Sequence, residues 1–323
     1  MKTTAITLAA LACLAVGATA GCSSSGGSAG SGGGSTPPPG STASTISGNG
    51  AGAAAADPAA VKLLPAAVKQ NGTISVAMEL NYPPTSYLSP SNQPVGFNVD
   101  IARLIAAKLG LKLKIDNVSF DTIIPGLTGG RYDFTATDMS ATPERLKVLD
   151  MINYWNDGSS LGVKAGNPKN LDINNSSVCG KSIAVMPGTT QQQTYAPLLS
   201  KKCASSGKPA INTVILPNVN AALTQLASGR IDGIFYDTPS LAYAAQQHGA
   251  AFTVAGAQYA KPASLGTTVV ALGLKKNSPL TKAVQAAMQS IMDGPEYAQV
   301  IKKWGFPSSA AIEKATIATT SGG

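Results

Sequence analysis

Residues 135–145 (Thr-Ala-Thr-Asp-Met-Ser-Ala-Thr-Pro-Glu-Arg) are the part of this chain best suited to binding a small anion. They follow an apolar segment, pass through small hydroxyl residues and end in Arg145. A bound carboxylate needs several charge-assisted hydrogen bonds at once, and hydroxyl groups, backbone N–H groups and a guanidinium supply them. The alternative is a strand, a turn and a capped helix that carries a surface arginine. The elements around this stretch decide between the two interpretations.

The composition excludes several classes of protein. The 323 residues allow about two ordinary domains, and only 12% of them are charged. The net charge of +8 is not concentrated in a Lys/Arg run with interleaved aromatic residues, which argues against a nucleic-acid partner. His248 is the chain's only histidine, so neither a histidine-based zinc site nor a Ser-His-Asp triad is expected. We therefore predict no catalytic residues, no metal and no cofactor.

The first sixty residues indicate export. Residues 1–21 have an early Lys2, an apolar run and small residues before Cys22, which is typical of a secretory signal peptide. Cys22 stands where bacterial lipoproteins carry their lipid-modified cysteine, although Thr19 replaces the usual leucine; ordinary cleavage and release is the alternative. Residues 22–60 are rich in Gly, Ser, Ala, Thr and Pro, which predicts a flexible tether. Cys13 lies within the signal segment, and in an oxidising compartment the other two cysteines, Cys179 and Cys203, are expected to form a disulfide.

Alternating strand and helix patterns follow the tether. Residues 74–78 read as a buried strand, and the Pro-rich loop after it carries Tyr82 and Tyr87. A helix over 98–109, a strand over 111–115, a helix over 121–127 and a strand over 132–137 come next. This order predicts an α/β fold with a mostly parallel sheet that is covered on both faces.

A repeated motif predicts two similar lobes. Residues 127–133 (Leu-Thr-Gly-Gly-Arg-Tyr-Asp) match residues 226–232 (Leu-Ala-Ser-Gly-Arg-Ile-Asp), and a second acid follows each, Asp138 and Asp237. Ligands of open parallel sheets bind beyond the carboxyl ends of the strands, so both second acids are expected in a shared cleft. The first acids, Asp133 and Asp232, lie at the opposite strand ends and are expected to be structural.

The second half of the chain offers one further candidate site. Residues 187–191 (Pro-Gly-Thr-Thr-Gln) end a strand and begin a helix that is expected to reach about residue 199. Such a turn is either an anion or carbonyl site or a routine helix cap. A strand over 269–274, a helix over 280–292 and a helical turn over 296–304 follow, and residues 307–323 are expected to be a loose tail.

Together these motifs resemble the amino-acid-type solute-binding proteins of ABC importers, family 3. The resemblance extends over residues 72–305 and implies the two-lobed type II periplasmic-binding-protein fold, with mostly parallel sheets, a hinge and a central cleft. The expected lobes are residues 61–160 plus 268–306 and residues 161–267, hinged near Ser159 and Leu265. The motifs that carry the resemblance are Tyr82-Pro-Pro, Gly96-Phe-Asn-Val-Asp-Ile, Ser119-Phe-Asp-Thr-Ile-Ile-Pro-Gly-Leu, Thr142-Pro-Glu-Arg, Gly188-Thr-Thr-Gln and Gly229-Arg-Ile-Asp through Asp237.

The resemblance also implies roles for individual residues. In this family an arginine at the Arg145 position binds the ligand's α-carboxylate, an acid at the Asp237 position binds its α-ammonium, and Tyr82 and Phe120 match the residues that enclose its side chain. Tyr87 is a substitute for the aromatic residue that the family often has where this chain has Thr85. The cysteine pair resembles that of a subset from Gram-positive bacteria. The other residues expected at the ligand are Met139, Ser140, Met186, Thr189, Thr190 and Gln191.

The predicted cleft is unusually acidic. Glu79 matches a position that carries an acid in relatives for basic amino acids, and Asp138 departs from the Ser, Thr or Gly that the family usually has. With Asp237, these acids favour a cationic ligand such as an amino acid, a guanidino compound or a polyamine. Alternatively, Asp138 is a helix cap or the salt-bridge partner of Arg145.

The implied function is that of a monomeric receptor, anchored to the outer face of the cell membrane by its lipid, that delivers an amine-bearing solute to an ABC permease and its ATPase. An enzyme resembling the cyclohexadienyl or arogenate dehydratases is an alternative, with Glu79 or Asp138 as the acid/base group. A sensory binding module is another.

Overall fold

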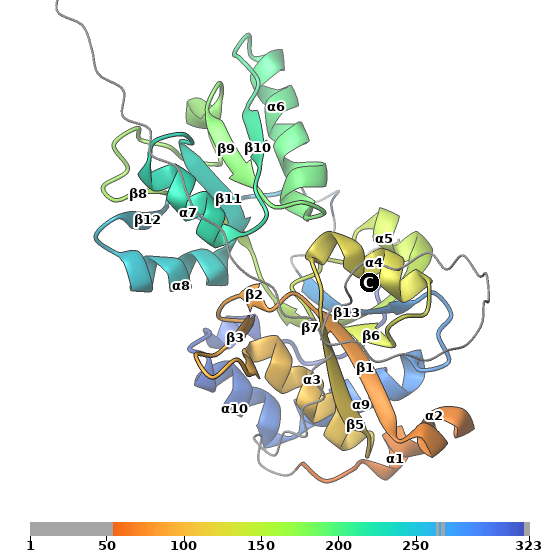
Figure 1. The fold of residues 1–323 in the computed structure, drawn as a ribbon. Coiled ribbons are helices and arrows are strands. Elements are labelled where there is room, and N and C mark those ends of the chain that lie inside the picture. The colour runs from red at the N-terminus through yellow and green to blue at the C-terminus, as the bar shows by residue number, and fades with distance from the viewer. Residues whose placement is uncertain (1–53, 263–264, 266–268, 320–323) are drawn as a thin grey trace, which may run out of the picture. The chain divides into compact units, whose positions relative to one another are not determined.

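The computed structural model describes residues 54–262, 265 and 269–319. The predicted signal peptide and Cys22 lie outside these residues. Two five-stranded sheets and one small three-stranded sheet form the framework (Figure 1).

The first sheet has the strand order β5-β1-β6-β13-β7. β1 pairs in parallel with β5 and β6, while β13 pairs antiparallel with β6 and β7. Four strands therefore run in one direction and β13 opposes them. The strand expected over 132–137 is short, because only two of its residues pair with β1. The bounds are β1 (Thr73–Met78), β5 (Lys112–Asn117), β6 (Phe134–Thr135), β7 (Leu149–Asn156) and β13 (Val269–Lys275).

Side-chain alternation along the strands explains how helices cover both faces of this sheet. In β1, Ile74 and Val76 pack into a core with α3, α9 and α10, whereas Ala77 packs on the other face with α4 and α5. Successive residues of a strand point to opposite faces, so a sheet buried on both sides needs apolar residues at both parities. The helices are α3 (Phe97–Lys108), α4 (Phe120–Thr128), α5 (Pro143–Val148), α9 (Thr281–Asp293) and α10 (Pro295–Lys303).

The second sheet repeats this plan with the order β10-β9-β11-β8-β12. β9 pairs in parallel with β10 and β11, and β8 runs antiparallel between β11 and β12. One face packs against α6, and the other packs against α7 and α8. The elements are β8 (Ser159–Lys164), β9 (Ser182–Val185), α6 (Ala196–Ser205), β10 (Asn212–Ile215), α7 (Val219–Ala227), β11 (Gly233–Asp237), α8 (Thr238–His248) and β12 (Phe252–Ala255).

Short elements complete the described chain. The helix expected from the Gly188 turn to residue 199 begins as a π-helix and continues as α6, which ends at Ser205. These short elements are α1 (Pro58–Lys62), α2 (Ala66–Asn71), β2 (Asn81–Tyr82), β3 (Ser86–Leu88), β4 (Pro94–Val95), the 3-10 helix η1 (Ser176–Val178), the π-helix η2 (Gln191–Tyr195) and the 3-10 helix η4 (Ser308–Ala310).

The repeated motif has the same structural role in both sheets. Asp133 accepts hydrogen bonds from the backbone N–H and the hydroxyl of Ser75, each at 2.7 Å. Asp232 accepts one from the backbone N–H of Ser182 at 2.7 Å and forms an ion pair with Lys169. Each acid thus ties the start of one strand to its parallel neighbour, which confirms that these two acids are structural.

The ends of the folded region differ from two expectations. Asp57 accepts hydrogen bonds from the first N–H groups of α1, and Ala60 is fully buried, so ordered structure begins inside the range predicted as tether. The expectation of a loose tail is wrong for residues 308–318. Asn153 of β7 donates to the carbonyl of Thr316 at 2.9 Å, and Ala315 is buried. The tail adds backbone hydrogen bonds to an otherwise unpaired sheet edge, and an unpaired edge is costly to leave open.

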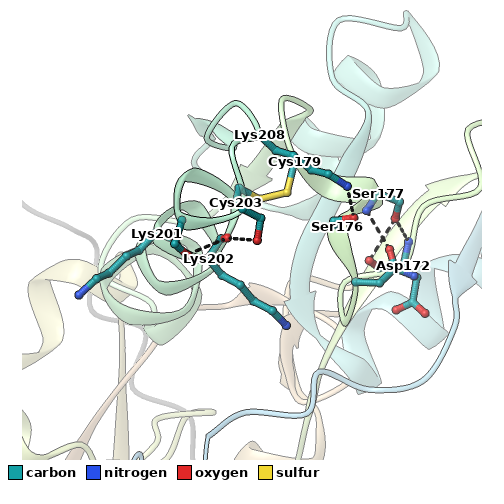
Figure 2. The surroundings of a disulfide bond; sticks show 11 residues. Asp172, Ser176, Ser177, Cys179, Lys201, Lys202, Cys203 and Lys208 are labelled. Carbon is teal, nitrogen blue, oxygen red and sulfur yellow. Dashed lines mark hydrogen bonds between the residues drawn. A yellow bond between two sulfur atoms is a disulfide. The ribbon is translucent and has the colours of Figure 1, made fainter.

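The predicted disulfide between Cys179 and Cys203 is present, with the two Cα atoms 5.6 Å apart. It joins the segment after η1 to α6, and Cys203 belongs to the core on that face of the second sheet. Figure 2 shows the bond beside Lys208, whose ammonium donates to Ser176 at 2.5 Å. The bridge therefore ties α6 to the segment that leads into β9.

Candidate functional site

Residues from both five-stranded sheets meet at one small cavity. Both sheets belong to the compact unit of residues 41–323. Ten of the thirteen residues predicted at the ligand line this cavity: Glu79, Tyr82, Phe120, Asp138, Ser140, Arg145, Thr189, Thr190, Gln191 and Asp237. A second small cavity shares Asp138, Ser140 and Asp237 with it. We refer to the two together as the acidic cleft.

Arg145 is placed in the cleft by α5. The hydroxyl of Thr142 caps this helix by accepting from the backbone N–H of Arg145 at 3.3 Å. The guanidinium is 5% exposed and donates to the carbonyls of Ser140 at 2.9 Å and Gly188 at 3.0 Å. It also lies over the ring of Phe120, 5.6 Å from the centroid. Burial lowers the pKa of Arg145 to about 10, so the side chain remains a cation at neutral pH.

Asp237 reaches the cleft as the last residue of β11. One carboxylate oxygen accepts from the hydroxyl of Tyr82, and the other accepts from the amide of Gln191 at 2.5 Å. Burial raises the pKa of Asp237 to about 6, although these two hydrogen bonds and the charge of Arg145 oppose the rise. The two hydrogen bonds therefore fix the orientation of the carboxylate. Its pKa of about 6 means that its protonation can change just below neutral pH.

Asp138 is held by donors that the sequence did not indicate. It accepts from the hydroxyl of Thr85 at 2.6 Å and from the amide of Asn98 at 3.2 Å. Asn98 is itself fixed, because it accepts from the hydroxyl of Tyr154 at 2.6 Å. The suggestion that Asp138 pairs with Arg145 or caps a helix is wrong, because these amide and hydroxyl donors bind its carboxylate instead. Burial and the nearby charge of Asp237 raise the pKa of Asp138 to about 7.

Negative groups outnumber positive ones in the cleft. Burial and the charge of Asp121 raise the pKa of Glu79 to about 7. The pKa of Asp157 is also raised by burial and by two neighbouring acids, and burial lowers that of Lys261 to about 8. Burial is the largest cause of these raised acid pKa values, and the charges of neighbouring acids add to it for Glu79, Asp138 and Asp157. The charged residues that line the cleft are the acids Glu79, Asp138, Asp157 and Asp237 and the cations Arg145 and Lys261.

The cleft is too small for an amino acid in this structure. Each of its two cavities has a volume of about 20 Å³, which is enough for about one water molecule. Contacts between the two halves close it: Tyr82 donates to Asp237, and Arg145 donates to Gly188. An incoming ligand must therefore separate these groups and replace their hydrogen bonds.

Three of the residues predicted at the ligand lie elsewhere. Met139 is fully buried in the core under α4 and α5, and Met186 is 3% exposed in the core under α7. Tyr87 packs its ring 6.2 Å from each of Tyr243 and Trp304. Both methionines lie beyond the ends of short strands, and their apolar side chains pack into the cores on the faces of the sheets instead of turning towards the polar cavity.

The cleft also contains residues that the sequence reasoning missed. Thr137 and Tyr236 line the cavity, and the ring of Tyr236 lies edge-on to Tyr82 at 5.1 Å. Asp157 follows directly after β7, where the chain first crosses between the sheets. The sequence feature that could have identified Asp157 is an acid at the end of a strand, as at Asp237.

Two further classes of site are not supported by the part of the chain that the structure describes. None of its helices is both long and apolar enough to cross a membrane. No three or more His, Cys, Asp or Glu side chains in residues 54–262, 265 and 269–319 gather in a way that would hold a metal ion.

Comparison with known proteins gives a consistent result. The model of the bacterial extracellular solute-binding proteins, family 3, matches residues 74–307. The arginine-binding protein ArgT of Corynebacterium glutamicum is 26% identical over 75% of this chain and 77% of its own length. A putative ABC transporter arginine-binding protein of Escherichia coli is 28% identical over 72% of this chain and 90% of its own length.

A solved structure agrees with these relatives. An ancestral arginine-binding protein bound to arginine aligns with a TM-score of 0.63 and 28% identity, over 72% of this chain and 98% of its own. The similarity confirms the predicted α/β fold with two lobes. The named relatives are binding proteins for transport and not enzymes, as the sequence predicted.

Proposed function

The chain belongs to the bacterial extracellular solute-binding proteins of family 3, and we propose that its solute is a cationic amino acid, with L-arginine as the first candidate. The family makes it the binding component of an ABC importer for an amino acid or a related amine. The excess of acids over basic residues in the cleft supports the proposal that the ligand is cationic. The arginine-binding relatives from two bacteria support the same ligand.

The positions of the charged groups suit a zwitterion with one additional positive charge. Arg145 is the cation for the α-carboxylate, because a buried guanidinium can form paired hydrogen bonds to the two oxygens of a carboxylate. Asp237 is the acceptor for the α-ammonium. Glu79 and Asp138 then remain for a cationic side chain, and Phe120 and Tyr82 provide aromatic faces for its alkyl part.

Ligand capture requires movement of the two lobes. We take residues 61–160 plus 268–306 as one lobe and residues 161–267 as the other. The chain crosses between them at residues 157–158 and again after β12. Tyr259 donates its backbone N–H to the carbonyl of Ser159 at 2.7 Å, so the two crossings contact each other. Residues of the predicted hinge next to Leu265 lie partly outside the described residues. Rotation about these crossings opens the cleft, and a ligand that contacts both lobes favours closure.

The cellular setting is also part of the proposal. A signal peptide over residues 1–21 would direct the export of the protein. A lipid on Cys22 would then hold a monomeric receptor at the outer face of the cell membrane, near the permease and ATPase. A Cys22→Ala variant expressed in the native host should lose its membrane attachment and appear in the soluble fraction. Membrane attachment that survives this substitution would argue against lipidation at Cys22.

A thermal-shift screen of the mature protein tests the proposed ligand. A ligand that binds the native state raises the melting temperature, and cationic amino acids should do so more than neutral or acidic ones. The screen includes ornithine, polyamines and arogenate. A shift only with acidic or neutral amino acids would contradict the cationic assignment, and turnover of arogenate would indicate the dehydratase alternative.

A further inference from the structure

A larger cavity lies on the other side of the crossing segments. Its volume is about 470 Å³, whereas each cavity of the acidic cleft has about 20 Å³. Small-molecule sites in proteins usually fall between about 300 and 1,000 Å³. We call it the rear cavity. Its walls come from the end of β7, from α8, from Gln258 and from the segment after α10.

The rear cavity is separate from the acidic cleft. The two share one lining residue, Asp157. The crossing segments between them are tightly packed: a Cβ atom added at Gly158 would lie 2.5 Å from the side-chain amide of Gln258. A solute bound by Arg145 and Asp237 therefore does not occupy the rear cavity, and the proposed function leaves this space unexplained.

Aromatic side chains dominate the walls and are already fixed in place. Trp155 stacks on Phe306 with ring centroids 5.1 Å apart. Trp304 donates its indole N–H to Asp100 at 2.9 Å. The ring of Tyr87, which does not line the cavity, packs against both Trp304 and Tyr243. Rings that are already ordered lose little conformational entropy when a ligand binds, so less of the contact energy is offset. The aromatic residues that line the cavity are Trp155, Tyr243, Trp304 and Phe306.

The charge of the lining selects a class of ligand. Asp157 is the only ionisable acid that lines the rear cavity, and neither lysine nor arginine lines it in the part of the chain that the structure describes. The amides of Asn156 and Gln258 each donate one hydrogen bond, to Ser309 at 3.3 Å and to Thr238 at 3.0 Å. The indole N–H of Trp155 is a buried neutral donor without a hydrogen-bond partner among the described residues. An anion would find aromatic π-faces, which repel it, and the oxygens of Asp157, which offer it no positive charge. A cation would find both attractive.

We propose that the rear cavity is a second binding site, for a small organic cation with an aromatic or alkyl body. The body lies among the rings of Trp155, Tyr243, Trp304 and Phe306, and its ammonium faces Asp157. Apart from the shared Asp157, none of its lining residues belongs to the acidic cleft. Its existence can therefore be tested separately from the proposed function.

The chain supplies its own reporter for the test. It contains two tryptophans, Trp155 and Trp304, and both line the rear cavity. We would titrate the mature protein with phenethylamine and, in parallel, with 3-phenylpropionate, which has a similar body and the opposite charge. Phenethylamine should change the tryptophan emission in a saturable way, and 3-phenylpropionate should not at the same concentrations.

Variants on α8 show where the amine binds. Ala242→Phe fills the cavity and should abolish the saturable response, whereas Gln247→Phe adds the same ring at an exposed position of the same helix outside the lining and should leave it intact. Tyr243→Leu keeps apolar volume but removes one aromatic face, so the apparent affinity should fall ~3-fold or more. Circular dichroism and melting curves confirm that each variant is folded.

Three outcomes would overturn the proposal. These are an emission that does not respond saturably to phenethylamine, an equal response to 3-phenylpropionate, or an amine affinity that a folded Ala242→Phe variant leaves unchanged. The last outcome would place the amine in the acidic cleft instead.

Discussion

Arg145 has an unusual environment for a cation. It is almost fully buried, and its hydrogen-bond partners are neutral carbonyl and hydroxyl oxygens rather than a carboxylate. The charge of Asp237 acts on Arg145 without a direct hydrogen bond between them, and a ligand carboxylate would supply a direct ionic partner. The residue is thus prepared to bind an anion and is not part of a structural ion pair.

Replacing Arg145 by alanine should weaken amino-acid binding by about 2 kcal/mol or more, because the ligand's carboxylate would be buried without a partner. Isothermal titration calorimetry measures the change. Arg131→Ala is the matched control, since Arg131 is exposed and contacts only the ring of Tyr132 among the interactions described. An unchanged dissociation constant in Arg145→Ala would remove this residue from the site.

Asp138 has a different expected effect. Its carboxylate is held by Thr85 and Asn98 and does not need a ligand for orientation. Asp138→Ser should therefore lower the affinity for cationic amino acids more than the affinity for neutral ones. Competition experiments that rank arginine, ornithine and glutamine measure this change. A ranking that stays the same would mean that Asp138 only supports the fold.

The raised acid pKa values predict a pH dependence. Asp138 and Glu79 have pKa values of about 7 and Asp237 of about 6, above their values near 4 in an unfolded chain. The folded state therefore binds more protons between about pH 4 and pH 7, and these groups make the free protein less stable as the pH rises through this window. Groups with lowered pKa values, such as Asp232, change the free energy of unfolding at pH values below this window.

A cationic ligand needs these carboxylates ionised, so its binding should release protons near neutral pH. Calorimetry at about pH 6.5 in buffers of different ionisation enthalpy counts the protons, and affinity should increase from about pH 5 to about pH 8. Proton uptake on binding, or an affinity that falls as the pH rises, would contradict the assignment of a cation to this cleft.

At the scale of the elements, the disulfide and the site are separate features. Cys179–Cys203 closes a loop with a sequence separation of 24, which contributes about 3 kcal/mol in the chain-entropy description. The double variant Cys179→Ala, Cys203→Ala should lose about this much free energy of unfolding in urea. The dissociation constant for the ligand should stay the same, because neither cysteine lines the cleft. A large loss of affinity without loss of stability would show that α6 positions the site.

Much of the element pattern could be predicted from the sequence, because it depends on local periodicity. Strand 74–78, the helix from Asn98 and the repeated Gly-Arg-X-Asp motif all follow from spacing of apolar and turn residues. The same spacing placed Asp138 and Asp237 at strand ends, and therefore in one cleft.

The remaining features depend on packing between distant segments. Thr85 and Asp138 are 53 residues apart, and no local pattern indicates that they bind each other. The position of Tyr87 depends on where the Pro-rich loop turns, and its ring packs beside Tyr243 and Trp304 instead of lining the acidic cleft. The tail had too few apolar residues to show a period, although Ala310 and Ala315 are buried.

At the scale of the whole molecule, binding must be coupled to lobe movement. The group proposed for the α-carboxylate, Arg145, belongs to the first lobe, and the group proposed for the α-ammonium, Asp237, belongs to the second, so neither half alone supplies both. The cavity volumes of about 20 Å³ show that the halves must separate before an amino acid can enter. A ligand that bridges both halves then favours closure through its contacts with each.

The most direct test of this account is a calorimetric titration of the mature protein with L-arginine and L-citrulline. The two have nearly the same shape, but citrulline lacks the side-chain positive charge that Glu79 and Asp138 are proposed to bind. We predict micromolar or tighter binding of L-arginine, about 8 kcal/mol, and an affinity for L-citrulline that is ~10-fold weaker or more. Equal affinity for the two, or binding of neither, would contradict the account.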